Sequence, residues 1–356
     1  MVKNEQFIDL RSDTVTLPTD EMLEAIKHAE LGDDVFDEDP TVNRLQQMAS
    51  EKMGKEAALL VASGTQANLV SLMSNATRGD MVILEAESHI YWYEVGGLSA
   101  IGGLLPWPIK GNHGALNPID VRAALKTKDI HFPETTLVCI ENTHNRAGGM
   151  IIPPNKIKAI SEVVHSNGLR LYMDGARIFN AAVAMETDVK EFTRYVDSLM
   201  FCLSKGLSCP IGSIVVGSHE FIKKAKKIRK VLGGGMRQAG IIAAPGIIAL
   251  EKMIDRLKED HANARLLAKK IAKTEGISID TTNVQTNILH FNVTCLGMTS
   301  GQFVSKLKEK HILALTRDEK TVRMVTHRGI EREHIEEAVT AVENVVGEIV
   351  KQGKNA

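Results

Sequence analysis

Short apolar runs alternate with amphipathic stretches through the first two thirds of the chain. Apolar residues recur at intervals of three and four over Thr41–Met53, which predicts an amphipathic helix. Runs of strand length occur at 57–61, 81–84, 136–140, 169–173, 199–203 and 213–216. Helical segments such as Ile157–Ser166 separate several of them. This order predicts an α/β fold with a mostly parallel sheet flanked by helices.

The pattern changes after about residue 232. Gly233–Gly235 precede one long helical pattern that extends from about 239 to 274. Beyond it, the spacing of apolar residues predicts further strands and helices at 288–293, 304–310, 322–326 and 332–351. We therefore expect a large domain over residues 1–250 and a smaller C-terminal α/β domain over 251–356.

Composition and charge exclude some classes of function. The 356 residues are 44% hydrophobic and 24% charged, which suffices for a large buried core. The 43 Lys and Arg balance 44 Asp and Glu, so the chain has no overall basic field for nucleic acid. The basic segment His219–Lys230 is therefore better explained as a solvated helix face. No apolar run approaches the roughly 20 residues of a membrane helix. The N-terminus has no apolar signal core, and the four cysteines have no CxxC spacing. We expect a cytoplasmic protein without a nucleic-acid or membrane partner.

Polar residues follow several predicted strands, and ligands of open α/β sheets bind beyond the carboxyl ends of the strands. These candidates are Ser63-Gly64-Thr65, His89, Glu141-Asn142, Asp174–Arg177 and Ser204–Gly206. The turn at Ser63–Thr65 precedes a predicted helix at 66–75. Its free backbone N–H groups could bind a phosphate, and an ordinary helix cap is the alternative.

Asp174 and Lys205 give the more specific signals. Asp174 could hold a protonated ring nitrogen, form an ion pair with Arg177 or cap the start of a helix. Lys205 follows an apolar strand, where burial disfavours its charge, so it could form a Schiff base or extend to solvent at a domain edge. His89 and His131 could stack on a flat cofactor or carry a proton. Together these groups match the needs of pyridoxal 5′-phosphate (PLP).

Longer motifs identify a family. They are Ile8–Thr16, Gly32–Val35 with Asp39–Val42, Gly64–Asn68, Glu141–Asn145, Asp174–Ile178, Leu203–Leu207, Gly233–Gln238 and Arg323–His327. On these motifs, which span nearly the whole chain, it resembles the low-specificity L-threonine aldolases, which are PLP-dependent enzymes of fold type I, the aspartate aminotransferase-like superfamily. The chain departs from the common family pattern at Ser88 and at Arg328–Ile330.

The resemblance implies a role for each matching position. Lys205 would carry PLP as a Schiff base, Asp174 would pair with its ring nitrogen, and His89 would stack on the ring. The groups expected to hold the cofactor further are Ser63, Gly64, Thr65, Arg177 and, from a neighbouring subunit, Arg237. Those expected to bind the substrate are Ser12, Tyr93, Arg177, Arg323 and, across a dimer interface, Lys230, with His131 near the β-hydroxyl.

The implied reaction is retro-aldol cleavage of L-threonine or L-allo-threonine to glycine and an aldehyde such as acetaldehyde. The base at the β-hydroxyl is left open between His89, His131 and a bound water. A β-eliminating lyase on the same scaffold, which would release pyruvate and ammonia, is the alternative. The family implies a homodimer or homotetramer with shared active sites. We expect neither a metal site nor a nicotinamide site, because HExxH spacing and a GxGxxG turn are absent from the sequence.

Overall fold

The computed structural model describes residues 7–125 and 129–353. Contacts divide the chain into two compact units. The larger unit comprises Leu17–Ala147 and Ile151–Ile254, and the smaller one comprises the chain up to Thr16, Gly148–Met150 and the chain from Asp255 on. The N-terminal segment, which we expected in the large domain, is therefore grouped with the C-terminal residues in this division.

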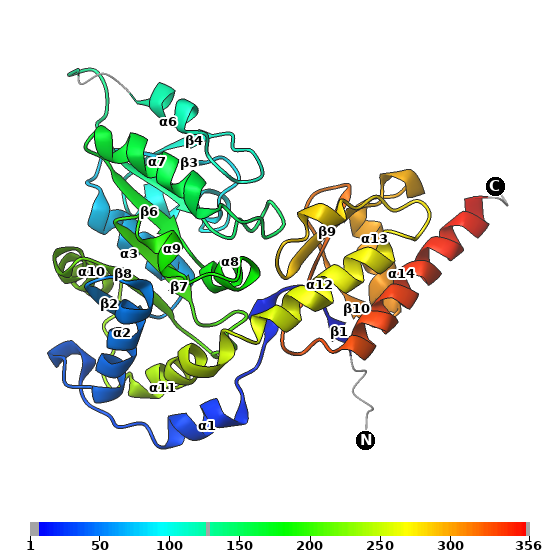
Figure 1. The fold of residues 1–356 in the computed structure, drawn as a ribbon, viewed down its shortest axis with the longest axis horizontal. Helices are drawn as coiled ribbons and strands as arrows, with labels where there is room; N and C mark the ends of the chain where they lie inside the picture. The colour runs from blue at the N-terminus through cyan, green and yellow to red at the C-terminus, as the bar shows by residue number, and fades with distance from the viewer. Residues whose placement is uncertain (1–6, 126–128, 354–356) are drawn as a thin grey trace. The chain divides into compact units, whose positions relative to one another are not determined.

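A seven-stranded sheet forms the centre of the larger unit, as far as the structure describes it (Figure 1). The strands, in the order in which they lie side by side, are β2 (Ala57–Val61), β8 (Ser213–Gly217), β7 (Ser198–Cys202), β6 (Arg170–Asp174), β5 (Thr135–Glu141), β3 (Met81–Glu85) and β4 (Leu105–Ile109). Neighbours from β7 to β4 are parallel, whereas β8 is antiparallel to β2 and to β7. The predicted mostly parallel α/β fold is confirmed.

Helices lie on both sides of this sheet (Figure 1). They are α1 (Asp20–Lys27), α2 (Pro40–Met53), α3 (Gly64–Asn75), α4 (His89–Trp92), α5 (Gly97–Ala100), α6 (Pro118–Ala124), α7 (Pro154–Ser166), α8 (Ile178–Ala184), α9 (Lys190–Thr193), α10 (His219–Val231) and α11 (Gly240–Ile248). Val70 of α3 and Ala225 of α10 belong to one apolar cluster with Val215 of the sheet. Because helices bury the strands, the strand sequences are nearly continuous apolar runs.

The smaller unit holds a three-stranded antiparallel sheet and three helices among its described residues. The sheet order is β11 (Leu315–Thr316), β12 (Thr321–Val325) and β9 (Ile288–Asn292), and the helices are α12 (Leu257–Ile271), α13 (Ser300–Glu309) and α14 (Arg332–Gly353). Strand β1 (Ile8–Asp9) pairs in parallel with β10 (Ile312–Leu313). Leu10 lies fully buried in the same core as Phe291 and Phe303. These contacts attach the N-terminal segment to this unit.

The long helix predicted from 239 to 274 is wrong as a single helix. The chain forms α11, a π-helical turn over Ala249–Met253 and then α12. Pro245 lies inside α11, where it lacks the N–H that would bond to the carbonyl four residues earlier. Because the apolar spacing continues on both sides of this interruption, periodicity alone could not locate the break.

The segment Gly32–Val42 is an anchoring motif built on buried carboxylates. Asp39 is fully buried and caps α2 by accepting the Val42 N–H at 3.0 Å. Its other oxygen accepts the N–H groups of Gly32 at 3.2 Å and Gly240 at 2.8 Å. One carboxylate therefore joins this loop to the starts of α2 and α11.

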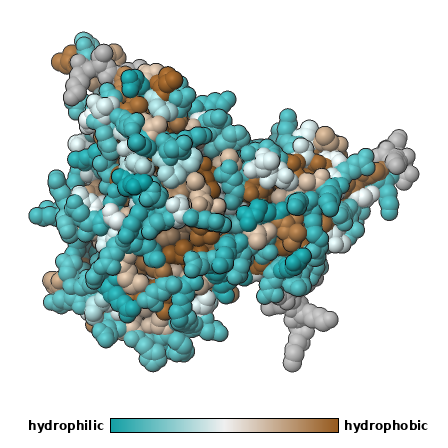
Figure 2. Space-filling view, viewed as in Figure 1, coloured by the Kyte–Doolittle hydropathy of each residue, from teal (hydrophilic) through white to brown (hydrophobic). Residues whose placement is uncertain are grey.

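Within the described residues, no helix is long and apolar enough to cross a membrane. On the face drawn in Figure 2, hydrophilic side chains cover most of the surface and the hydrophobic ones form small areas.

Replacing Asp39 by Ala leaves three backbone N–H groups without their acceptor. We expect the free energy of unfolding to fall by about 2–3 kcal/mol, measured by urea denaturation. Glu38→Ala, at an exposed neighbouring position, is the matched control and should change it by less than about 0.5 kcal/mol. Equal stability of the two variants would contradict the anchoring role of Asp39.

Candidate active site

The carboxyl ends of adjacent parallel strands bring acidic side chains to one edge of the sheet. Strand β3 ends at Glu85, β5 at Glu141 and β6 at Asp174. The register places Glu141 beside Asp174, and all three carboxylates are buried. Lys205 follows β7, the next strand along, so it leaves the sheet at the same edge.

Asp174 is held rigidly at this edge. It is 2% exposed, and its Oδ1 accepts the backbone N–H of Ala176 at 3.0 Å. Its Oδ2 accepts the side-chain amide of Asn68, from α3, at 2.8 Å. Hydrogen bonds of this kind reduce the cost of burying a carboxylate. The residue can therefore present negative charge to a cationic group beyond the strand.

His89 begins α4 and pairs with Glu94, which is buried. Their Nδ1 and Oε1 atoms lie 2.9 Å apart. Burial lowers the pKa of His89, but the Glu94 hydrogen bond and the charges of Asp174 and Glu141 outweigh it, so the pKa is raised. Burial also raises the pKa of Glu94, and the charge of Asp174 raises it further against the opposing hydrogen bonds. The pair therefore retains a proton more firmly than its members would in water.

Two further carboxylates shape the backbone around His89. Glu141 accepts the N–H of His89 at 2.6 Å and that of Asn145 at 2.8 Å, which fixes the start of α4 against the loop after β5. Glu85 pairs with the fully buried His144 at 3.0 Å. It also accepts the Gly111 N–H at 2.9 Å. These contacts make the edge of the sheet a rigid frame.

Lys205 lies in the turn that connects β7 to β8. Its Nζ lies 3.3 Å from Sγ of Cys202, the last residue of β7. Its carbonyl accepts the Ser208 N–H at 2.8 Å, which closes the turn, and Ser208 adopts the left-handed region with φ +66°. The side chain is half-buried, so the amine is held at the edge of the sheet rather than in its core.

Helix α3 starts at the same edge, after β2. The Ser63 hydroxyl caps it by accepting the Gln66 N–H at 3.2 Å, so the helix begins at Gly64, two residues before the position predicted from sequence. A Cβ on Gly64 would lie 3.0 Å from Sγ of Cys202. The first turn therefore packs directly on β7. Gly64 and the exposed Thr65 contribute N–H groups without intrahelical acceptors, which suits an anion.

Tyr93 and Arg177 lie on the elements that carry the cluster. The ring of Tyr93 is 5.4 Å from the ring of His89, and its hydroxyl accepts a hydrogen bond from Arg146 at 2.8 Å. Arg177 is 6% exposed, immediately before α8, and donates to Asn145 at 3.4 Å. Both belong to the same unit as Lys205 and Asp174.

Three further candidates of the larger unit have exposed side chains. His131 precedes β5 at the opposite edge of the sheet, where its side chain is 82% exposed and contacts Asp129 at 2.6 Å. Lys230 is exposed near the end of α10. Arg237 forms an ion pair with Asp33 at 2.9 Å and is also exposed. The strand order therefore places His131 away from Lys205 within the chain, whereas Lys230 and Arg237 are described by their own contacts and exposure.

Ser12 and Arg323 belong to the smaller unit. The Ser12 hydroxyl accepts the Thr14 N–H at 3.2 Å, capping a short 3-10 turn. Arg323 on β12 donates to the carbonyl of Arg11 at 2.9 Å. The structure therefore brings these two predicted substrate-binding residues together, although they are far apart in sequence.

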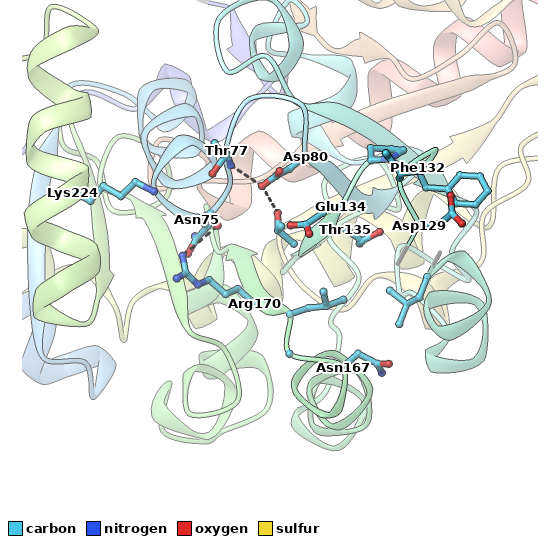
Figure 3. Close-up of a pocket in the computed structure, with 16 residues that line it drawn as sticks. Asn75, Thr77, Asp80, Asp129, Phe132, Glu134, Thr135, Asn167, Arg170 and Lys224 are labelled. Carbon is cyan, nitrogen blue, oxygen red and sulfur yellow. Dashed lines mark hydrogen bonds between the residues drawn. The ribbon is translucent and has the colours of Figure 1, made fainter. Parts of the chain in front are cut away.

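A cavity of about 740 Å³ lies at the amino ends of the strands (Figure 3). Its lining includes Asp80 just before β3, Thr135 at the start of β5 and Arg170 at the start of β6. Figure 3 shows the carboxylate of Asp80 bonded to the backbone N–H of Thr77. This cavity is at the edge of the sheet opposite Asp174 and Lys205, so it is not part of the candidate site.

Glu94 and Asn68 are not among the site residues predicted from the sequence. Glu94 lies in a short irregular stretch without apolar periodicity, so no strand end pointed to it. Asn68 belongs to the Gly64–Asn68 motif, but its place on a helix suggested no contact with Asp174. Its position one turn into α3, on the buried side, was the available signal.

Side-chain atoms of His89, Glu94 and Asp174 lie within 4.8 Å of one another, close enough to hold a metal ion. Both carboxylates, however, already accept from the amide of Asn68, and Glu94 also contacts His89. This donor set fits a hydrogen-bonded organic group better than a metal ion.

Comparison with known proteins identifies the family. The model of the beta-eliminating lyase family matches residues 9–294. The chain belongs to this family. It is 44% identical over 333 residues to the low specificity L-threonine aldolase of Escherichia coli strain K12, covering 93% of this chain and 96% of that protein. It is 41% identical over 328 residues to low-specificity L-threonine aldolase 1 of Arabidopsis thaliana, covering 91% and 92%.

A solved structure of Leishmania major threonine aldolase superposes on this lyase with a TM-score of 0.81 at 18% identity, over 95% of this chain and 99% of that one. At this identity the match supports the fold. The resemblance to PLP-dependent threonine aldolases that the motifs suggested is confirmed by the two closer relatives.

PLP is the cofactor of this lyase family, and the residues at the edge of the sheet fit it. A Cβ on Gly64 would lie only 3.0 Å from Sγ of Cys202, so glycine lets the first turn of α3, with its N–H groups, approach β7 closely. Asp174 offers a buried carboxylate, and Lys205 offers an amine on the neighbouring strand end. The donor set therefore matches a phosphate, a ring nitrogen and an aldehyde.

A larger side chain at Gly64 must displace the first turn of α3. We expect Gly64→Val to lower the free energy of unfolding by about 1–3 kcal/mol and to weaken PLP binding, measured by denaturation and by titration with PLP. Gly347→Val is the matched control, because it makes the same substitution in α14, where a Cβ meets open space. If Gly64→Val matches the wild type in both measurements, the packing of α3 does not set the anion site.

Proposed function

We propose that this lyase cleaves L-threonine and L-allo-threonine to glycine and acetaldehyde, and that other β-hydroxy-α-amino acids give glycine and the corresponding aldehyde. The observation that carries the proposal is the placement of buried Asp174 and of Lys205 after neighbouring strands, in a chain whose relatives are threonine aldolases. The substrate is thus a small amino acid.

In this proposal Lys205 holds PLP through its amine, and Asp174 keeps a proton on the ring nitrogen. Its two hydrogen bonds and its burial fix the carboxylate in place. Ser63, Gly64 and Thr65 bind the phosphate at the start of α3, and His89 stacks on the ring. Bound PLP supplies an electron sink for a carbanion at Cα.

The substrate carboxylate is bound by arginines. The family motifs assign this role to Arg177 and Arg323, and Arg323 donates to the carbonyl of Arg11, next to Ser12. Holding the carboxylate orients the Cα–Cβ bond for cleavage, which is catalysis by orientation. The β-hydroxyl loses its proton, the Cα–Cβ bond breaks with its electron pair left on Cα, and the aldehyde carbonyl forms. A proton then adds to Cα to give glycine.

The base at the β-hydroxyl is His89, acting directly or through a water. His131 is at the opposite edge of the sheet from Lys205, so it does not serve the site of its own chain. His89 and Tyr93 lie close together beside the buried cluster, which places Tyr93 near the substrate as well.

The chain assembles as a homodimer or homotetramer with shared sites. This proposal is supported by the exposed positions of Lys230, Arg237 and His131. Residues that match functional positions of the family but lie outside the chain's own cluster can act on a neighbouring subunit. All four cysteines are free thiols, which supports a cytoplasmic location.

Product analysis with PLP-loaded protein tests the reaction. We expect L-threonine and L-allo-threonine each to yield glycine and acetaldehyde in equal amounts. The PLP-free protein should form neither product. The ratio of the two rates gives the stereochemical preference. L-serine serves as the probe for β-elimination. If the protein forms pyruvate and ammonia in place of glycine, its reaction is β-elimination rather than aldol cleavage, and the proposal is overturned.

A further inference from the structure

A strained turn directs Glu94 into the protein. Val95 and Gly96 both adopt the left-handed region, with φ +55° and +67°, and the Gly97 N–H bonds to the Glu94 carbonyl at 2.9 Å. A β-branched residue in that region is a conformational outlier, and Val95 is 97% exposed, so its own side chain has no packing that explains the strain. Glu94, directly before it, is only 6% exposed.

The amide of Asn68 connects Glu94 to Asp174. Its Nδ2 donates to Oε1 of Glu94 at 2.6 Å and to Oδ2 of Asp174 at 2.8 Å. Its Oδ1 accepts from the buried hydroxyl of Tyr172 at 2.7 Å, which fixes the orientation of the amide. Both amide hydrogens are therefore used on carboxylates. Moving either carboxylate changes the hydrogen bond available to the other.

The same oxygen of Glu94 fixes the orientation of His89. When Glu94 is ionised its Oε1 accepts, so the proton of a neutral imidazole then resides on Nδ1 and Nε2 is the unprotonated nitrogen. A chain of contacts thus extends from His89 through Glu94 and Asn68 to Asp174. It begins at the ring proposed to stack on the cofactor and ends at the carboxylate proposed to hold its ring nitrogen.

We propose that Glu94 is a positioning residue that sets the proton and orientation of His89 and, through Asn68, couples them to Asp174. This inference rests on the proposed function for the part played by the cofactor. The contact between Glu94 and His89 belongs to the chain alone, so it can be tested without PLP.

The charge of Glu94 is the quantity to change. The groups that face His89 are Glu94, Asp174 from β6, Glu141 from β5 and the ring of Tyr93. Glu94→Gln keeps the size and an acceptor oxygen but removes one negative charge in hydrogen-bond contact with the imidazole. Loss of that charge makes protonation of His89 less favourable, so its pKa falls.

The titration of His89 in PLP-free protein is the first measurement. Protein labelled with ¹³C at histidine is titrated by NMR, with the His89 signal assigned by its loss in His89→Asn. We expect the midpoint in Glu94→Gln to fall by about one pH unit, a tenfold change in proton affinity.

In the PLP-loaded enzyme, kcat with L-threonine should fall about tenfold and its pH profile should shift to lower pH. Glu162→Gln, an exposed carboxylate on α7, removes the same charge elsewhere and should match the wild type.

Asn68→Ser tests the connection to Asp174 separately, because a hydroxyl has one hydrogen and can donate to only one carboxylate. We expect its PLP dissociation constant to rise about tenfold while circular dichroism stays native.

An unchanged His89 midpoint in Glu94→Gln, or unchanged PLP affinity in Asn68→Ser, overturns the coupling. If Glu94→Gln does not fold, Asn68→Ser decides. A wild-type enzyme that makes no glycine from threonine refutes the proposed function and leaves the His89 titration as the test of Glu94.

Discussion

Burying several carboxylates at one edge of a sheet is the constraint that shapes the rest of the larger unit. Glu85, Glu94, Glu141 and Asp174 are each less than a tenth exposed. Carboxylates at such depth are tolerated only with hydrogen-bond donors, because desolvation costs several kcal/mol per ion. The donors come from the loops after β3, β4 and β5, from α3 and from the start of α4. The carboxylates therefore determine where those loops run.

This frame explains how the chain can hold a cationic heterocycle. Parallel strands end at one edge, so Asp174 and Lys205 emerge side by side, and β2 delivers the start of α3 to the same edge. The negative cluster favours a protonated ring nitrogen, whereas the free N–H groups of α3 favour a phosphate. Opposite charges on one ligand are thus matched by opposite potentials from neighbouring elements. Within the smaller unit, Ser12 and Arg323 lie near each other because the N-terminal segment packs into the core of that unit.

Much of this arrangement could be predicted from the sequence, since buried parallel strands appear as apolar runs and the residues after them, such as Asp174 and Lys205, mark the edge. The prediction failed where periodicity carries no information. The interruption between α11 and α12 lies within a continuous apolar pattern, and Glu94 lies in a turn whose inward direction depends on the backbone of Val95. Asn68 could not be assigned because its two partners are contributed by distant segments. The family resemblance placed His131 near the β-hydroxyl, and the strand order puts it at the opposite edge of the sheet of its own chain, which the sequence alone did not indicate.

The central claim is that PLP is held by Lys205 beside Asp174 at the carboxyl edge of the sheet. The most direct measurement is to reduce the PLP-loaded protein with borohydride, digest it and locate the modified lysine by mass spectrometry. The account predicts one stoichiometric modification, on the peptide that contains Lys205. Modification of a different lysine, or none in a protein that shows PLP-dependent turnover, would contradict it.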